Sequence, residues 1–327
     1  MKMNSTNMIL LNVMMIGVIM TSSSNSWISM WMGLEMSMIS FIPLMGNQNN
    51  QMSSESMTKY FIIQSIASTM FLISTISMLI GVNMKMELMM KLSMLIKLGL
   101  VPFHNWIMMI IEFLSYQSMF ILLTIMKIQP MIIMFQLNSN ELLTIITMMS
   151  MTVSSISALN QSSMRKALGW SSIYNMSIML TTINKLMVSL IYLVIYSMIL
   201  LMLMSYFMLM KINYMNQLLF NEFSMMLKIN MWINMLSMSG FPLTMGFFIK
   251  LIIIQTLIME NQYMIVMFLT LTSILIMMFY TRMTFNSMMT YNYMKKWMMI
   301  SMNKPMYFLM ITNVTLMSMM LTIISFM

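Results

Sequence analysis

The chain has 327 residues, of which 60% are hydrophobic and 7% charged, and its formal net charge is +9. Soluble domains carry roughly 25% charged residues, so this composition excludes that class and favours a membrane protein. The chain has no cysteine and one histidine, which excludes thiolate-held iron–sulfur clusters and leaves little for axial metal ligation. No glycine-rich phosphate loop is present, so no nucleotide site is predicted.

Apolar stretches of about 20 residues, enough to cross a bilayer as a helix, recur along the whole chain. The alternating ten-residue pattern of outer-membrane barrels is missing, so we expect an all-α polytopic bundle of about eleven transmembrane helices. We expect them to form one transmembrane domain over residues 1–327. In chain order the expected spans are 8–24, 27–45, 60–82, 90–111, 117–136, 142–159, 167–184, 187–210, 231–256, 263–281 and 306–325.

The first of these spans has an alternative interpretation as part of a signal peptide. Residues 1–26 combine Lys2, an apolar run and a serine-rich stretch. Ser22–Ser24 lack a small-residue cleavage pattern, and the chain has no cysteine for an oxidising compartment to use. We therefore expect an uncleaved first span.

Basic residues outside the spans or at their ends divide unevenly when the chain alternates sides of the membrane. The side of the N-terminus receives Lys2, Lys59, Arg165, Lys166, Lys211, Lys228, Arg282, Lys295, Lys296 and Lys304. The opposite side receives Lys85, Lys91 and Lys185. The positive-inside rule then places the N-terminus on the cytoplasmic or matrix side. The net positive charge follows from this loop bias and does not indicate nucleic-acid binding.

Four charged residues lie within the expected spans, away from the span ends: Glu35, Lys97, Lys127 and Lys250. A charge at bilayer depth costs at least about 2.5–3.5 kcal/mol, so such residues usually serve a proton or ion path. They are the candidate functional residues of this chain.

Two of the expected spans contain helix-breaking residues next to these lysines. Pro102 interrupts the span of Lys97, and the run Ser239-Gly-Phe-Pro242, with Gly240, precedes Lys250. Proline removes a helical hydrogen bond and clashes with the preceding turn, so both spans should kink or unwind. Transporters built of two structural repeats place interrupted helices in corresponding positions beside the ion path.

Five short motifs follow one another along the chain: Trp31-Met-Gly-Leu-Glu35, Lys97-Leu-Gly-Leu-Val-Pro-Phe-His104, Lys127-Ile-Gln-Pro130, Asn160-Gln-Ser-Ser-Met-Arg-Lys166 and Ser239-Gly-Phe-Pro242. In this order they resemble mitochondrial NADH dehydrogenase subunit 2, an antiporter-like membrane subunit of respiratory complex I. The resemblance runs from about residue 25 to 255 and weakly to the end.

The resemblance implies a fourteen-helix antiporter-like ancestor shortened at its N-terminus. It also implies that Glu35, Lys97, Lys127 and Lys250 are the family's buried proton-path residues. The chain would lie in the mitochondrial inner membrane, among lipids and other membrane-arm subunits, with its N-terminus in the matrix. It would bind no cofactor and no NADH itself, because NADH, FMN, iron–sulfur clusters and ubiquinone belong to partner subunits.

Each candidate residue also has a structural interpretation. Glu35 and Lys97 could form a static buried pair instead of a proton-loading switch. Lys127 has no carboxylate in its own span; burial without a partner favours the neutral form of a lysine, as a relay requires. His104 suits proton transfer, but an isolated histidine bonded to an unwound carbonyl fits as well.

This chain departs from the family pattern at three positions. Asn175 stands where members usually carry histidine, so a titratable relay is in doubt there, although a water bridged by the amide could replace it. Leu243 replaces a second proline in the later break, and Ile249 precedes Lys250. The later break could therefore be milder.

The function predicted from the sequence is proton translocation within NADH:ubiquinone oxidoreductase. One alternative is a free-standing cation/proton antiporter, which the single buried glutamate and the absence of aspartate disfavour. A sister antiporter-like subunit of complex I is a closer rival, which the short N-terminus disfavours. A passive assembly subunit of the same complex is opposed only by the buried charges.

Overall fold

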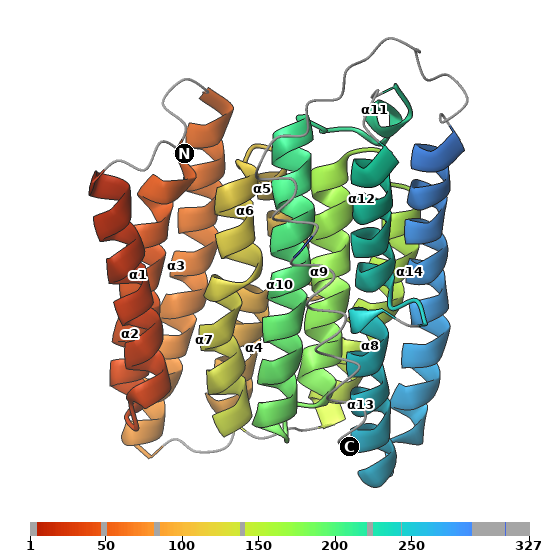
Figure 1. Cartoon of the computed structure of the whole chain (residues 1–327). Helices are drawn as coiled ribbons and strands as arrows, with labels where there is room; N and C mark the ends of the chain where they lie inside the picture. The colour runs from red at the N-terminus through yellow and green to blue at the C-terminus, as the bar shows by residue number, and fades with distance from the viewer. Residues whose placement is uncertain are drawn as a thin grey trace. The chain divides into compact units, whose positions relative to one another are not determined.

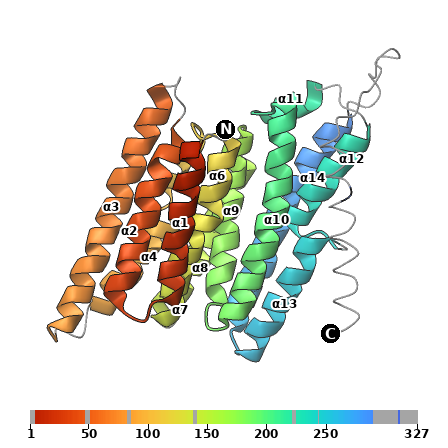
Figure 2. The ribbon, with the colours of Figure 1, turned by 60° about the vertical axis from the view of Figure 1, so that its left-hand side comes forward.

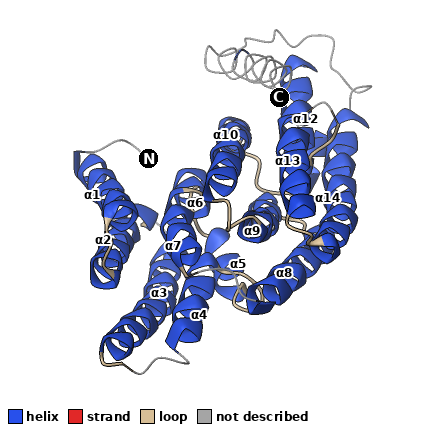
Figure 3. Ribbon diagram, turned by 90° about the horizontal axis from the view of Figure 1, so that it is seen from below, coloured by secondary structure: helices blue, strands red, loops and turns tan. Residues whose placement is uncertain are grey.

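The computed structural model of the chain describes residues 5–46, 51–81, 86–137, 141–220, 225–242, 244–289 and 311. Throughout these ranges the chain is helical apart from short connections, and an isolated β-bridge joins Ser163 to Tyr214. Viewed along the helix axes, the described elements are all helices (Figure 3). The predicted all-α class is confirmed.

Figure 1 labels the helices in chain order. The earlier helices are α1 (Ser5–Ser23), α2 (Trp27–Met45), α3 (Gln51–Leu79), α4 (Met86–Leu98), α5 (Asn105–Ile111), α6 (Tyr116–Leu123) and α7 (Ile125–Gln136). The later helices are α8 (Glu141–Leu159), α9 (Met164–Thr181), α10 (Leu186–Met210), α11 (Met215–Phe220), α12 (Met225–Ser239), α13 (Met245–Met259) and α14 (Tyr263–Met289).

The chain divides into two compact units, each described here by itself. The first comprises residues 1–153 and 172–189, and the second comprises residues 154–171 and 190–327. In the first unit α1 packs beside α2, α2 beside α3, and α4 against both α3 and α7 (Figure 2). In the second unit α12, α13 and α14 pack against one another. The expectation of a single domain stays a prediction.

Seven helical stretches are long and apolar enough to cross a membrane: Ser5–Ser23, Trp27–Met45, Gln51–Leu79, Tyr116–Gln136, Leu142–Leu159, Leu186–Met210 and Tyr263–Phe285. Each overlaps a span expected from the sequence. The expected spans 90–111 and 231–256 are present as the interrupted pairs α4–α5 and α12–α13. The last expected span, 306–325, lies outside the described residues except for Ile311. The count of eleven stays a prediction.

Helix α9, which overlaps the expected span 167–184, is the most polar of the long helices. Its Ser171, Ser172, Asn175 and Ser177 side chains are all buried. Ser171 and Ser177 donate to the carbonyls of Leu168 and Tyr174 in their own helix. These polar side chains are accommodated because they are buried inside the protein and because hydroxyls donate to carbonyls of their own helix.

Candidate functional site

The first interruption separates α4 from α5 and ends α4 with a left-handed glycine. Gly99 has φ +67°, and its amide donates to Leu95 and Ile96, while the Leu100 amide donates to Leu95. This is the glycine-terminated capping arrangement that satisfies the last carbonyls of a helix. A cis peptide bond at Val101–Pro102 follows. The break predicted at Pro102 is confirmed.

Lys97 and Trp106 lie on opposite sides of this break. Lys97 is the penultimate residue of α4 and is buried. Trp106, at the start of α5, donates its indole Nε1–H to the Ile96 carbonyl at 3.0 Å. The indole therefore fastens the start of α5 to the last turn of α4.

Lys127 reaches this same helix end from a different helix. It is buried near the start of α7, and its ammonium donates a hydrogen bond to the carbonyl of Leu98, the last residue of α4. The ammonium also lies 5.5 Å from the centre of the Trp106 ring. A helix C-terminus carries partial negative charge, and an aromatic face attracts cations. Lys127 thus has a partner that the sequence did not predict.

The span that contains Lys127 is interrupted at Thr124, which separates α6 from α7. Thr124 has φ −119° and ψ −72°, and its hydroxyl donates to the Phe120 carbonyl. The amide of Lys127 donates to the Thr124 carbonyl, three residues back, instead of to the carbonyl four residues back as in a regular α-helix. This third interruption, which the sequence analysis missed, places Lys127 in the first turn of α7.

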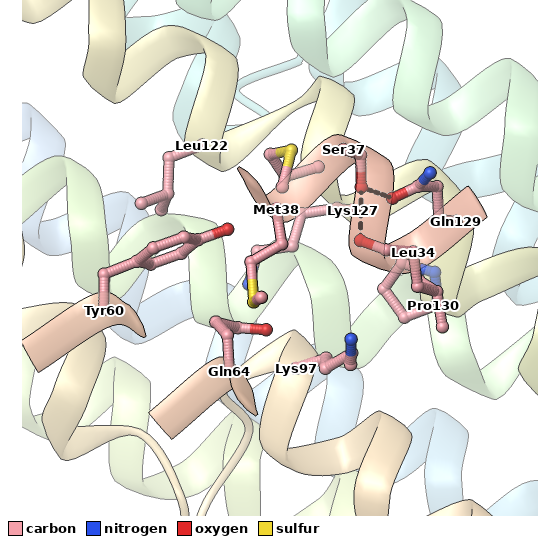
Figure 4. Close-up of a pocket in the computed structure, with 11 residues that line it drawn as sticks. Leu34, Ser37, Met38, Tyr60, Gln64, Lys97, Leu122, Lys127, Gln129 and Pro130 are labelled. Atoms are coloured by element: carbon pink, nitrogen blue, oxygen red, sulfur yellow. Dashed lines mark hydrogen bonds between the residues drawn. The ribbon is translucent and has the colours of Figure 1, made fainter. Parts of the chain in front are cut away.

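A small cavity lies between the two lysines. Its polar lining comes from Ser37, Tyr60, Gln64, Lys97, Lys127 and Gln129, and its apolar lining from Leu34, Met38, Leu122, Met126 and Pro130 (Figure 4). The cavity has a volume of about 20 Å³, which is enough for one water molecule. A water here would connect groups from α2, α3, α4 and α7.

Glu35 lies half-buried on α2, close enough to interact electrostatically with Lys97 and Tyr60. Among the described residues, however, no ion pair within 4.0 Å joins Glu35 to Lys97. The static buried pair considered from the sequence is therefore not formed in this structure. The carboxylate and the ammonium remain separate groups.

His104 occupies the N-terminal boundary of α5 without capping it through its side chain. The ring is half-buried and hydrogen-bonds to the backbone of Pro102. This contact matches the structural alternative, a histidine bonded to an unwound carbonyl. His104 does not line the cavity, and Pro102 is exposed.

The second interruption separates α12 from α13 and repeats the capping of the first. Gly240 has φ +79°, its amide donates to Leu236 and Ser237, and the Phe241 amide donates to Leu236. Lys250, buried on α13, donates to the carbonyl of Ser239, the last residue of α12, at 2.6 Å. The predicted break is therefore confirmed, with Pro242 exposed in the connection.

Glycines allow the two halves of this second break to approach closely. A Cβ on Gly240 would lie 2.8 Å from the Lys250 Nζ, and one on Gly246 would lie 1.9 Å from the Ser237 carbonyl oxygen. No side chain larger than hydrogen fits at Gly246 without moving backbone. These contacts hold the lysine against the end of α12.

The structure thus brings Glu35, Lys97 and Lys127 together in the first unit and places Lys250 in the second. Asn175 is buried on α9. Within the described parts of the chain, no three His, Cys, Asp or Glu side chains converge as metal ligands would. Sequence reasoning missed Ser37, Gln64 and Gln129, because uncharged polar residues carry no distinctive signal in a serine-rich chain.

Comparison with known proteins identifies the family of the chain. Residues 24–277 match the family model described as NADH:quinone oxidoreductase/Mrp antiporter, transmembrane. NADH-ubiquinone oxidoreductase chain 2 of Aedes aegypti is 41% identical over 79% of this chain and 78% of its own length.

Two solved structures share the fold. A chain of respiratory complex I from Thermus thermophilus aligns with a TM-score of 0.78 at 18% identity, covering 87% of this chain and 71% of its own. A chain of the Mrp complex from Dietzia sp. aligns with a TM-score of 0.74 at 13% identity, covering 84% and 59%. On the sequence identity and the family match, the chain belongs to the NADH-ubiquinone oxidoreductase chain 2 family of antiporter-like membrane subunits.

Proposed function

We propose that this chain is a proton-translocating membrane-arm subunit of NADH:ubiquinone oxidoreductase in the mitochondrial inner membrane, with its N-terminus in the matrix. Other membrane-arm subunits and membrane lipids are its neighbours. The partner subunits bind NADH, FMN, iron–sulfur clusters and ubiquinone, and this chain binds none of them. Proton movement outward stores about 2.3 kcal/mol per charge for every 100 mV of membrane potential.

The observation that carries this proposal is the bonding of buried lysines to the ends of interrupted helices. Lys127 bonds to the Leu98 carbonyl, and Lys250 bonds to the Ser239 carbonyl. Among the described residues no ion pair involves Lys97 or Lys127. A lysine held by neutral carbonyls can release its proton without leaving a buried carboxylate unpaired, whereas breaking a buried ion pair is costly.

The proposed route uses Glu35, Lys97, Lys127 and Lys250 in turn. Movement of Glu35 towards or away from Lys97 changes the electrostatic interaction at the lysine and so loads or releases a proton there. A water molecule in the cavity would bridge Lys97 to Lys127. Lys250 is the terminal lysine of the route. Redox chemistry in partner subunits drives these steps through conformational or electrostatic change.

Membership in the complex is tested by native electrophoresis of mildly solubilised membranes. We expect this chain to co-migrate with a very large band that oxidises NADH. A small separate band without that activity would indicate a free-standing antiporter instead.

The relay is tested by the ratio of protons moved to electrons transferred in assembled complex carrying Lys97→Met. We expect the ratio to fall, and Lys59→Met, at a partly exposed position on α3, is the matched control. An unchanged ratio in assembled complex would indicate a passive assembly role.

A further inference from the structure

Gln129 is a buried polar residue on α7 that the proposed relay does not use. Its side chain is 1% exposed and lies two positions after Lys127. The amide extends to α2, where the Ser37 hydroxyl lies 2.6 Å from Gln129 Oε1 (Figure 4). Gln129 Nε2 donates to the Gly33 carbonyl at 3.2 Å. The two contacts on α2 flank Glu35 on either side in the sequence.

The Ser37 hydroxyl has one hydrogen and two acceptors within reach. The Leu34 carbonyl in its own helix lies at 2.9 Å, and Gln129 Oε1 lies at the shorter distance. Bonding to Leu34 alone would leave Gln129 Oε1 without this donor in a buried site. Buried polar atoms are costly to leave unbonded, so the contact with α7 is favoured.

Gly33 is also the point where α1 meets α2. A Cβ on Gly33 would lie 2.8 Å from the Gly17 carbonyl oxygen, and a Cβ on Gly17 would lie 2.8 Å from the Gly33 carbonyl oxygen. The two backbones therefore touch at these glycines, as small residues allow in membrane helices. The Gly33 turn is held by α1 on one side and by Gln129 of α7 on the other.

We propose that Gln129 is a positioning residue that fixes the Glu35-bearing turn of α2 against the Lys127-bearing turn of α7. One residue of helix register corresponds to about 1.5 Å of rise and 100° of rotation. A small slip of α2 would therefore change the separation between the Glu35 carboxylate and its neighbours Lys97 and Tyr60. The inference rests on the proposed function only in treating Glu35 as a relay group.

The test measures the environment of Glu35 directly in the assembled complex. A hydrophobic carbodiimide reacts with protonated carboxyl groups, and mass spectrometry gives the rate of modification at Glu35 as a function of pH. In Gln129→Met, which keeps length and loses both bonds, we expect the rate to change about tenfold or more, with a shifted pH profile. Gln136→Met, at an exposed position on the same helix, should behave as wild type.

A wild-type rate and pH profile at Glu35 in Gln129→Met would overturn the positioning role. If Gln129→Met does not assemble, Ser37→Ala carries the test, because it removes one of the two bonds and leaves the packing. Ser37→Ala should then change the rate about threefold to tenfold. A wild-type rate there would equally overturn the proposal.

Different measurements would refute the positioning role of Gln129 and the relay role of Glu35. Glu35→Gln with an unchanged ratio of protons to electrons would refute the relay while leaving the labelling result intact. An unchanged labelling rate in Gln129→Met would refute the positioning role whatever Glu35 does in pumping. A double variant, Ser37→Ala with Gln129→Met, should label as Gln129→Met alone does; additive effects would contradict a shared bond.

Discussion

The two interrupted spans end their first halves in the same way. In each, a glycine at positive φ follows the last helical residue, and the next amide bonds five residues back, Leu100 to Leu95 and Phe241 to Leu236. In each, the carbonyl of the last helical residue accepts a hydrogen bond from a buried lysine. The glycine cap satisfies the inner carbonyls, and the lysine satisfies the outer one.

The two breaks differ in where the lysine comes from. Lys250 belongs to α13, the second half of its own broken span, so its bond depends on a short local connection. Lys127 comes from α7, and its bond depends on the packing of α7 against α4. Both breaks therefore share the pairing of a lysine ammonium with a helix end, whereas the helix that supplies the lysine differs between them.

Gly246→Ala is expected to have the largest effect, because it attacks the local connection of the second break. The added Cβ would lie 1.9 Å from the backbone oxygen of Ser237, so α12 and α13 must separate. Overpacking of this kind costs about 1–3 kcal/mol or more. We expect little assembled complex on native gels. Gly46→Ala, whose Cβ would meet nothing closer than 3.4 Å, is the control.

Gly240→Ala and Gly99→Ala compare the two caps directly. Both glycines have positive φ, so each alanine carries a backbone cost of about 1–2 kcal/mol. At Gly240 the new Cβ would meet Lys250 Nζ at 2.8 Å, whereas at Gly99 it would meet the Ile107 side chain. We expect similar losses of thermal stability and a lower proton-to-electron ratio for Gly240→Ala. A lower proton-to-electron ratio in Gly99→Ala, with a wild-type ratio in Gly240→Ala, would contradict this expectation.

Trp106→Phe tests the aromatic support that the first break provides to Lys127. The variant loses the indole hydrogen bond to the Ile96 carbonyl, which retains its bond from the Gly99 amide. We expect destabilisation of about 1 kcal/mol, measured as a lower midpoint of thermal inactivation, together with a modest loss of coupled activity. Trp27→Phe, next to Phe71, should leave coupling unchanged.

Glu55→Gln should have the smallest effect, because the Glu55–Lys59 ion pair near the start of α3 is exposed. The pair is 2.5 Å long, but its side chains are 53% and 38% exposed. Exposed pairs of this spacing contribute about 0.3–0.5 kcal/mol. We expect wild-type assembly and coupling in activity assays, and a loss of coupling would show that charge at this end of α3 matters.

The sequence predicted the breaks because proline and glycine act locally on the backbone. Pro102 and Gly240 mark the interruptions directly, and the cost of burying charge identifies Lys127 and Lys250. The sequence could not predict which groups accept hydrogen bonds from these lysines. The acceptors are backbone carbonyls, which every residue has, and packing decides which carbonyl each lysine reaches. Gln129 and Ser37 were missed because uncharged polar residues carry no distinctive signal in a serine-rich chain. The interruption at Thr124 was missed because no glycine marks it.

The most direct test of the central claim is the ratio of protons moved to electrons transferred in sealed vesicles containing assembled complex with Lys127→Met or Lys250→Met. Lys59→Met is the control at a partly exposed position. If lysines at both helix ends carry protons, the ratio falls in both variants and is unchanged in the control. A wild-type ratio in both variants, with the complex intact, would contradict the account.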